Sequence, residues 1–196
     1  DEWQRVKNTI IKLKKNFPKI LLSLDTRKSY VMSNGIENGV DIINDVSGLN
    51  FDKRSFDLIN SKKKPFILHH MQGTPETMQN NPTYDDVISE ILFFLETKAE
   101  EYIKAGINED KIIIDPGIGF GKTSIHNLTL LGNLITFVNS GYSVLLGASR
   151  KRFMGDICNV ETPSELIGAT TATTAVGVQA GVKIFRVHDV MPNRQA

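Results

Sequence analysis

Six short apolar stretches recur along the chain, and each of them ends in polar or titratable residues. Segments with helical periodicity separate these stretches, so the sequence predicts strands that alternate with helices. This alternation is typical of a parallel α/β sheet, because one parallel strand can follow another only after a long crossover connection. The predicted strands lie in the segments KILLSLDT, VDIINDVSG, PFILHHMQG, KIIIDPG, YSVLLGASRK and VKIFRVHDV.

The polar strand ends bear on the choice between two α/β architectures. An open doubly wound sheet concentrates its site at one switch point of the strand order, whereas a (β/α)8 barrel gathers every strand end at one rim. Chemistry-bearing residues after six successive strands therefore favour the barrel. These residues are Asp25 and Thr26, Asn44 and Asp45, His69 and His70, Asp115, Ser149 to Lys151, and His188 with Asp189.

The number of strands falls short of a complete barrel. A (β/α)8 barrel has eight strands, but the chain of 196 residues supplies six, and its first predicted element is an amphipathic helix. That helix places Trp3, Ile10 and Phe17 on one face and ends at Pro18. We therefore expect a single barrel domain over residues 1–196 that lacks its first two strands.

Helix signals give approximate boundaries for three helices in the second half of the chain. One helix is predicted from about Tyr84 to Ala105, with Thr83 as its N-cap, and another over residues 127–139. A third is predicted to begin at Thr162, which would form a capping box with Glu165.

Composition excludes several functional classes. The net charge of +1 gives no electrostatic reason to expect nucleic-acid binding. Cys158 is the only cysteine, which excludes an internal disulfide and fits a reducing compartment. No segment combines the length and apolar purity of a membrane span, and no signal peptide is recognisable. A cytoplasmic protein without membrane partners is the expectation.

A glycine-rich loop follows the fourth predicted strand in the segment IIIDPGIGFGKTS. A nucleotide-binding P-loop needs two glycines separated by four residues before the Lys-Ser/Thr pair. Counted back from Lys122, the first of these glycines would stand at position 116, which is Pro116, and Gly117 is one residue too close. The P-loop interpretation is therefore set aside.

Each strand-end residue also has a plain structural explanation. Asp25, Asp45 and Ser149 could be helix N-caps, and the glycine-rich loop could be an ordinary turn. Caps would not explain a set that also contains Arg186 and His188, which lie two apart and so share one face of a strand. The combination favours a small-molecule site at the strand ends.

The motifs LSLDT, DIINDVSG, HHMQGTPETMQ, DPGIGFGK, GASRKRF and FRVHDV occur in this order and together resemble the dihydropteroate synthase family, which sulfonamides inhibit. The resemblance covers essentially the whole chain. It implies a (β/α)8 barrel of which this chain carries about six units, the third to the eighth. Two upstream features of the family are not found in the sequence: an Asn that meets the metal-bound diphosphate and a mobile loop that closes over p-aminobenzoate.

The resemblance implies a reaction in folate biosynthesis. In this reaction 6-hydroxymethyl-7,8-dihydropterin diphosphate and p-aminobenzoate give 7,8-dihydropteroate and pyrophosphate. A carboxylate can accept hydrogen bonds from the ring N–H and the amino group at the pterin edge in parallel, and Asp115 is the expected contact. The implied pterin-binding residues are Asp25, Asn44, Met71, Asp115, Gly147 and Lys151.

The resemblance also assigns the remaining site residues. Arg186 and His188 are expected to bind the diphosphate and, with Lys151, to be catalytic. Phe120 and Arg152 are the expected p-aminobenzoate contacts, although many bacterial members have Ser in place of Arg152. Magnesium is expected to be held mainly by the diphosphate and by a residue upstream. No residue cluster has the spacing of a dedicated metal site, so no metal ligand is assigned.

The resemblance further implies a homodimer and leaves open a fusion to a pyrophosphokinase domain. The helix over residues 164–180, which is rich in small side chains, is the expected dimer contact. A plant-like source would make the protein mitochondrial rather than cytoplasmic. Two alternatives remain: a pterin-binding methyltransferase barrel that serves a corrinoid, and an inactive pterin-binding fragment of a larger fusion.

Overall fold

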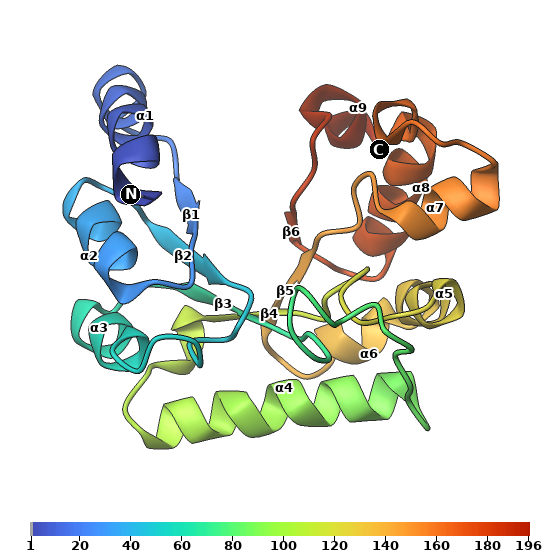
Figure 1. Ribbon diagram of the computed structural model, residues 1–196, viewed down its shortest axis with the longest axis horizontal. Helices are drawn as coiled ribbons and strands as arrows, with labels where there is room; N and C mark the ends of the chain where they lie inside the picture. Colours follow the sequence, from blue (N-terminus) through green and yellow to red (C-terminus); the bar gives the residue numbers. More distant parts are fainter. Residues whose placement is uncertain (1) are drawn as a thin grey trace. The chain divides into compact units, whose positions relative to one another are not determined.

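The computed structural model describes residues 2–196, in which six strands alternate with helices (Figure 1). Each strand lies in one of the six apolar segments, so the predicted strands are confirmed. Their bounds are β1 (Ser23–Asp25), β2 (Ile42–Asp45), β3 (Phe66–His69), β4 (Ile112–Asp115), β5 (Ser143–Leu146) and β6 (Ile184–Phe185). Among the described residues, no helix is both long and apolar enough to span a bilayer.

The chain divides into two compact units. The first unit consists of Asp1–His69 with Ala99–Ile113, and the second consists of His70–Lys98 with Ile114–Ala196. The strand β4 and the helix α4 (Val87–Lys104) each contribute residues to both units. The single-domain organisation stays a prediction.

The first unit contains three parallel strands in the order β1-β2-β3. In the register of these strands Leu24 lies opposite Ile43, and Ile43 lies opposite Phe66. Ile43 and Phe66 are fully buried, as expected for strands whose two faces are both covered. The helices of this unit are α1 (Glu2–Asn16), α2 (Ser29–Glu37) and α3 (Ser55–Lys62), and the short 3-10 helix η1 (Glu109–Lys111) precedes β4.

Helix α1 confirms most of its predicted apolar face. Trp3 and Ile10 are buried, whereas Phe17, which was expected on the same face, is exposed. The reason is that α1 ends at Asn16, one residue before Phe17.

The second unit contains the parallel pair β5-β6, in which Leu145 lies opposite Ile184 and Leu146 opposite Phe185. Leu130, Phe137 and Leu146 are among its buried apolar side chains. Its helices after α4 are α5 (Ser124–Gly132), α6 (Leu134–Val138), α7 (Arg152–Cys158), α8 (Ile167–Gln179) and α9 (Val190–Gln195), with the 3-10 helix η2 (Pro163–Glu165) between α7 and α8. Helices α7 and α9 were not predicted.

The predicted start of α4 is wrong by three residues. The helix begins at Val87, and the Asp86 carboxylate caps it by accepting from the backbone N–H groups of Ile88 (2.9 Å) and Ser89 (3.0 Å). The predicted cap, Thr83, instead bonds through its backbone to the side chain of Gln72. An aspartate makes the stronger cap because its charge also complements the positive helix end.

Two further helix predictions need correction. The helix expected over residues 127–139 is divided into α5, capped by Thr123 through the N–H of His126 (3.2 Å), and α6 after Asn133. The predicted capping box of Thr162 and Glu165 is absent: Thr162 makes no side-chain cap bond, and η2 occupies this segment before α8 begins at Ile167.

Candidate active site

The predicted site residues occur in both compact units. Asp25 and Asn44 belong to the first unit. The second unit holds the remaining predicted residues, namely Met71, Asp115, Phe120, Gly147, Lys151, Arg152, Arg186 and His188.

In the first unit the ends of β1 and β2 bring Asp25 and Asn44 together. The two residues are register partners, and the Asn44 side-chain N–H donates to the Asp25 carboxylate over 2.7 Å. Asn44 is buried and its Oδ1 has no hydrogen-bond partner among the described residues, whereas Asp25 is exposed. A buried acceptor without a donor is uncommon in folded proteins. The pair therefore offers acceptor oxygens to a ligand that carries N–H groups.

The neighbouring Asp45 is not a helix cap but part of a tight turn. Its Oδ1 accepts from the backbone N–H (2.8 Å) and the hydroxyl (2.6 Å) of Ser47. The residue is fully buried, and burial raises the pKa of its carboxyl above the ordinary value despite these two hydrogen bonds. Asp45 thus stabilises the turn after β2.

In the second unit the fully buried Asp115 ends β4. One carboxylate oxygen accepts from the Gly117 N–H over 2.8 Å, and the other accepts from Nη2 of Arg186 over 3.2 Å. The Arg186 side chain is 40% exposed, so the pair has one buried and one accessible partner. This geometry joins the residue expected to bind the pterin to the residue expected to bind the diphosphate.

Arg186 and His188 do not lie on a strand as the sequence predicted. The strand β6 ends at Phe185, and both residues follow it. Their proximity is set instead by hydrogen bonds from the segment after β5. The Ser149 hydroxyl accepts from the backbone N–H of His188 (3.1 Å) and bonds to the Nδ1 of its ring (2.9 Å). The sequence placed Ser149 among the polar strand-end residues, with a helix cap as its plain explanation, and the structure shows that it bonds to His188.

Gly147 stands where the Arg186 guanidinium crosses the end of β5. A Cβ atom at position 147 would lie 2.5 Å from Nη2 of Arg186, which is closer than any real contact. A side chain at position 147 would therefore displace the Arg186 guanidinium from its place beside Asp115. Met71 is half-buried and directly follows His70.

Lys151 lies over the face of the Phe120 ring. Its Nζ is 4.0 Å from the ring centroid, within the range of a cation–π interaction. Burial, with a smaller contribution from the charge of Arg186, lowers the pKa of Lys151 to about 8, and the carboxylate of Asp115 acts in the opposite direction. A substantial fraction of Lys151 is therefore neutral just above neutral pH.

Lys122 is a buried amine that the sequence analysis considered only as a P-loop lysine. It is 3% exposed, and its Nζ donates to the Phe120 carbonyl over 2.9 Å and bonds to Nδ1 of His70 over 3.1 Å. Burial lowers the pKa of Lys122 to about 7, and the charge of Lys151 adds to this effect while Asp115 opposes it. The only sequence feature that could have pointed to this buried amine is its position directly after a glycine-rich loop.

A cavity of about 400 Å³ lies beside these lysines. Lys122, Lys151 and Arg152 are among its lining residues, together with Gln79 and the first turn of α5. Three basic side chains around one cavity suit an anionic group such as a carboxylate.

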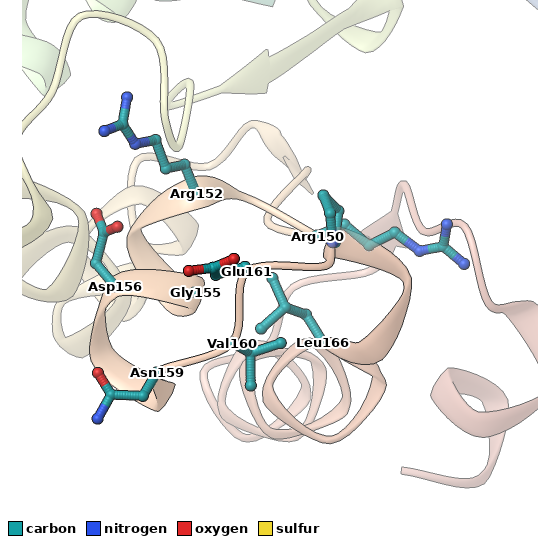
Figure 2. A pocket seen from close by; sticks show the side chains of 9 residues that line it. Arg150, Arg152, Gly155, Asp156, Asn159, Val160, Glu161 and Leu166 are labelled. Atoms are coloured by element: carbon teal, nitrogen blue, oxygen red, sulfur yellow. The ribbon is translucent and has the colours of Figure 1, made fainter.

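A second and larger cavity, of about 780 Å³, lies along α7 (Figure 2). Figure 2 shows the side chains of Arg150 and Arg152 pointing away from each other, with Val160 and Leu166 below them in this view. The Arg150 guanidinium pairs with the carboxylate of Asp189 at 2.8 and 3.1 Å. Lys151 lines the smaller cavity but not this one. Because the charges of Asp115 and Arg186 act on Lys151, the candidate active site is the smaller cavity together with that ion pair.

The described residues contain no group of three or more His, Cys, Asp or Glu side chains that could hold a metal ion. A magnesium ion at this site would therefore need most of its ligands from a bound substrate.

Comparisons with known proteins agree with the motifs. The sequence profile of a family described as pterin binding enzyme matches residues 1–188. A dihydropteroate synthase of Haemophilus influenzae is 40% identical over 169 residues, which cover 86% of this chain and 61% of that protein. The chain thus spans about three fifths of this relative.

Solved structures give the same result for the fold. A dihydropteroate synthase structure from Stenotrophomonas maltophilia superposes with a TM-score of 0.94 at 38% identity, covering 99% of this chain and 72% of that one. The Xanthomonas albilineans enzyme in complex with 7,8-dihydropteroate superposes with a TM-score of 0.91 at 34% identity, covering 99% and 68%. The six-stranded α/β fold of this chain therefore matches the corresponding part of these structures.

Proposed function

This chain belongs to the pterin-binding enzyme family, and we propose that it acts as a dihydropteroate synthase. The proposed reaction condenses 6-hydroxymethyl-7,8-dihydropterin diphosphate with p-aminobenzoate to give 7,8-dihydropteroate and pyrophosphate. The observation that carries the proposal is the ion pair of buried Asp115 with accessible Arg186 beside Lys151. One residue of this pair suits the pterin and the other suits the diphosphate.

Pterin recognition is assigned to hydrogen-bonding groups at the strand ends. The Asp115 carboxylate would accept hydrogen bonds from the ring N–H and the amino group. Two parallel hydrogen bonds to one carboxylate are strong and directional. Asp25 and Asn44, which belong to the first unit, stay predicted pterin contacts, and the partnerless Oδ1 of Asn44 is an acceptor suited to that role. Lys151 would donate to the ring carbonyl, and Met71 and Gly147 would line the ring.

Binding of the diphosphate leaving group is assigned to Arg186 and His188. The amine nitrogen of p-aminobenzoate forms a bond to the exocyclic carbon of the pterin while the bond from that carbon to the diphosphate oxygen breaks. The nitrogen then loses a proton to solvent, and pyrophosphate departs with the bonding electron pair. Fixed donors on the departing oxygens stabilise this transition state, by about 3 to 4 kcal/mol for one well-placed donor. The partnerless buried Nη1 of Arg186 is available for this contact.

The p-aminobenzoate carboxylate is assigned to the cavity lined by Lys122, Lys151 and Arg152. Phe120 would contact the aromatic ring, since its own ring lies beneath Lys151. Sulfonamides would compete for the same place because they present a similar aromatic amine and a polar group at the opposite end.

Magnesium is proposed as an ion held by the diphosphate of the substrate, where it would neutralise charge on the phosphate oxygens. The residues described in this chain do not supply a ligand set of their own. We therefore assign no step of the reaction to the metal.

A homodimer is proposed through α8. The helix buries Thr170, Thr174 and Gly177, while Ala172, Ala175 and Val176 are exposed on the opposite side, Val176 to 43%. An exposed face of this kind suits a self-complementary two-fold contact. The complete eight-stranded barrel, a cytoplasmic or plant-type mitochondrial location and a pyrophosphokinase fusion also remain proposals.

A pterin-binding methyltransferase is the second candidate. Its reaction has no diphosphate leaving group, so it gives no use to Arg186, His188 and the basic cavity. A pterin-binding protein without turnover is the third candidate.

One assay on the full-length protein separates the three candidates. Pyrophosphate release that requires both the dihydropterin diphosphate and p-aminobenzoate supports the synthase. Methyl transfer from methyltetrahydrofolate to a corrinoid without pyrophosphate release would support the methyltransferase. Pterin binding in calorimetry without either reaction would support the third candidate, a binding protein. Lys151→Met serves as the inactive control for pyrophosphate release.

A further inference from the structure

The glycine-rich loop Gly117–Gly121 is held by side chains at three consecutive backbone carbonyls. The Gly119 carbonyl accepts from the side-chain amide of Gln79 (2.7 Å), the Phe120 carbonyl from Nζ of Lys122 (2.9 Å), and the Gly121 carbonyl from the hydroxyl of Tyr84 (2.8 Å). Three such bonds in succession are more than a turn needs to close, so they fix the path of the loop.

Of these three donors, Lys122 is the buried one. Its side chain is 3% exposed, and its Nζ bonds to Nδ1 of His70, which is 8% exposed. The His70 ring itself packs edge-on against Phe94, with ring centroids 5.1 Å apart. The amine is therefore anchored to a ring that cannot easily move, and its direction toward the Phe120 carbonyl is set.

Burial of a lysine amine is unfavourable unless the amine is bonded, and it makes deprotonation easier. The pKa of Lys122, lowered to about 7, is a result of this burial. Lys122 borders the cavity assigned to the p-aminobenzoate carboxylate, but its Nζ is already bonded to the Phe120 carbonyl and to His70. These two bonds, rather than a substrate contact, account for the direction of the amine.

The carbonyl that Lys122 bonds belongs to Phe120, whose ring centroid lies 4.0 Å from Nζ of Lys151. Gly121 restricts the loop from the other side, because a Cβ atom there would lie 2.7 Å from the carbonyl oxygen of Gln72. With the backbone held at both positions, the point from which the Phe120 side chain extends is fixed, and the ring places its face 4.0 Å from the Lys151 Nζ.

We propose that Lys122 is a positioning residue that fixes the Phe120 carbonyl and thereby sets the Phe120 ring against Lys151. The kinetic consequence of this proposal rests on the proposed synthase function, because Phe120 and Lys151 are the groups that would meet p-aminobenzoate. The structural consequence does not depend on any activity.

The structural consequence is measured by NMR on the full-length protein with ¹³C-labelled lysine ε-methylenes. In the wild-type protein the ε-methylene protons of Lys151 should resonate upfield, because they lie over the Phe120 ring, and Lys151→Arg assigns the signal. Lys122→Met removes every N–H donor while keeping an unbranched side chain. It should return the Lys151 signal toward the position of an exposed lysine.

Lys122→Gln is the second variant. Its amide is shorter than a lysine arm and cannot span from His70 to the Phe120 carbonyl in the same way, so it should shift the Lys151 signal in the same direction by a smaller amount. If Lys122→Met does not fold, this variant alone decides. A wild-type Lys151 signal in a folded Lys122 variant overturns the proposal, whatever the kinetics show.

The kinetic consequence is a split between the two substrates. In Lys122→Met, kcat/KM for p-aminobenzoate should fall by about 10- to 100-fold, as for a small displacement of a binding group. The affinity for the bare pterin should fall distinctly less, because only its contact with Lys151 is disturbed while Asp115 keeps its partners. Equal losses for both ligands would overturn the positioning role. A wild-type protein without turnover, but with the expected Lys151 shift, would reject the synthase function and retain the positioning role.

Discussion

Nη2 of Arg186 lies 3.2 Å from Oδ2 of Asp115, so an accessible guanidinium neutralises a fully buried carboxylate at the end of β4. The two residues are 71 positions apart in sequence. Because they are in contact, the binding of a pterin at Asp115 and of a diphosphate at Arg186 should be coupled.

Gly147→Ala should break this pair without removing either partner. The new Cβ would lie 2.5 Å from Nη2 of Arg186, so the guanidinium must leave its position. The loss of a charge-assisted hydrogen bond is about 1.5–3 kcal/mol, and affinity for the pterin diphosphate should fall roughly 10- to 100-fold in calorimetry.

Gly132→Ala is the matched control for that variant. A Cβ atom at Gly132, the last residue of α5, meets nothing within 4 Å. Its effect on affinity should be negligible, and its effect on stability should stay within about 0.5 kcal/mol. Wild-type affinity in Gly147→Ala would mean that the position of Arg186 does not matter for binding.

Asp115→Asn should abolish tight pterin binding while the protein stays folded. Both carboxylate oxygens accept hydrogen bonds, from Gly117 and from Arg186. An asparagine can accept only one of them, and its amide N–H2 would face a donor, at a cost of about 1–3 kcal/mol. Titration with a pterin analogue and thermal unfolding measure the two effects.

Asp110→Asn controls for the loss of one negative charge. Asp110 is 65% exposed and pairs only with the neighbouring Lys111, so its replacement should leave both measurements near wild type. If Asp115→Asn bound the analogue as tightly as this control, Asp115 would not be a pterin contact.

The stability of the protein should rise with pH above neutrality, partly because of Lys122. An unfolded lysine has a pKa near 10.4, whereas burial lowers the pKa of Lys122 to about 7 in the folded protein. Between about pH 7 and pH 10 the unfolded chain therefore binds more protons, and the free energy of unfolding increases, by up to about 1.4 kcal/mol per pH unit for this group.

Urea denaturation at several pH values measures this rise. Lys151 contributes in the same direction above about pH 8, so the test is the difference between the wild type and Lys122→Met. The rise should be smaller in the variant. Parallel curves for the two proteins would show that Lys122 titrates like an exposed lysine.

Ala172→Glu should convert a dimer to a monomer. Ala172 is exposed on α8, one helical turn before Val176. A carboxylate there would be buried opposite its own copy across a two-fold axis, which is strongly unfavourable. Light scattering of the full-length protein at micromolar concentration decides. A monomeric wild type would reject the dimer, and Ala105→Glu, at another exposed alanine, serves as the control.

The strands and several of their terminal residues could be predicted from local pattern alone. A buried parallel strand is a continuous apolar run, and the polar residue after it marks the strand end, as Asp115 does after Ile112–Ile114. The helix starts were less predictable, because neighbouring residues compete as caps: Asp86 caps α4, although Thr83 also fits the sequence pattern.

The connections within the site could not be predicted, since they join residues that are distant in sequence. Lys122 meets His70 from 52 positions away, and Ser149 meets His188 from 39 positions away. The effect of a side chain at position 147 likewise cannot be predicted from the sequence, because it depends on the position of the Arg186 guanidinium. Such partners depend on which strand ends lie close together, which no local pattern records.

The measurement that most directly tests the account is a comparison of two ligands in Arg186→Met. Calorimetry on the full-length protein gives the affinities of 6-hydroxymethyl-7,8-dihydropterin diphosphate and of the same pterin without the diphosphate. The account predicts that the variant loses roughly 10- to 100-fold or more in affinity for the diphosphate ligand, as for a lost charge-assisted bond, and distinctly less for the bare pterin. Equal losses for the two ligands would contradict it, because Arg186 would then only support Asp115 and would not bind the diphosphate.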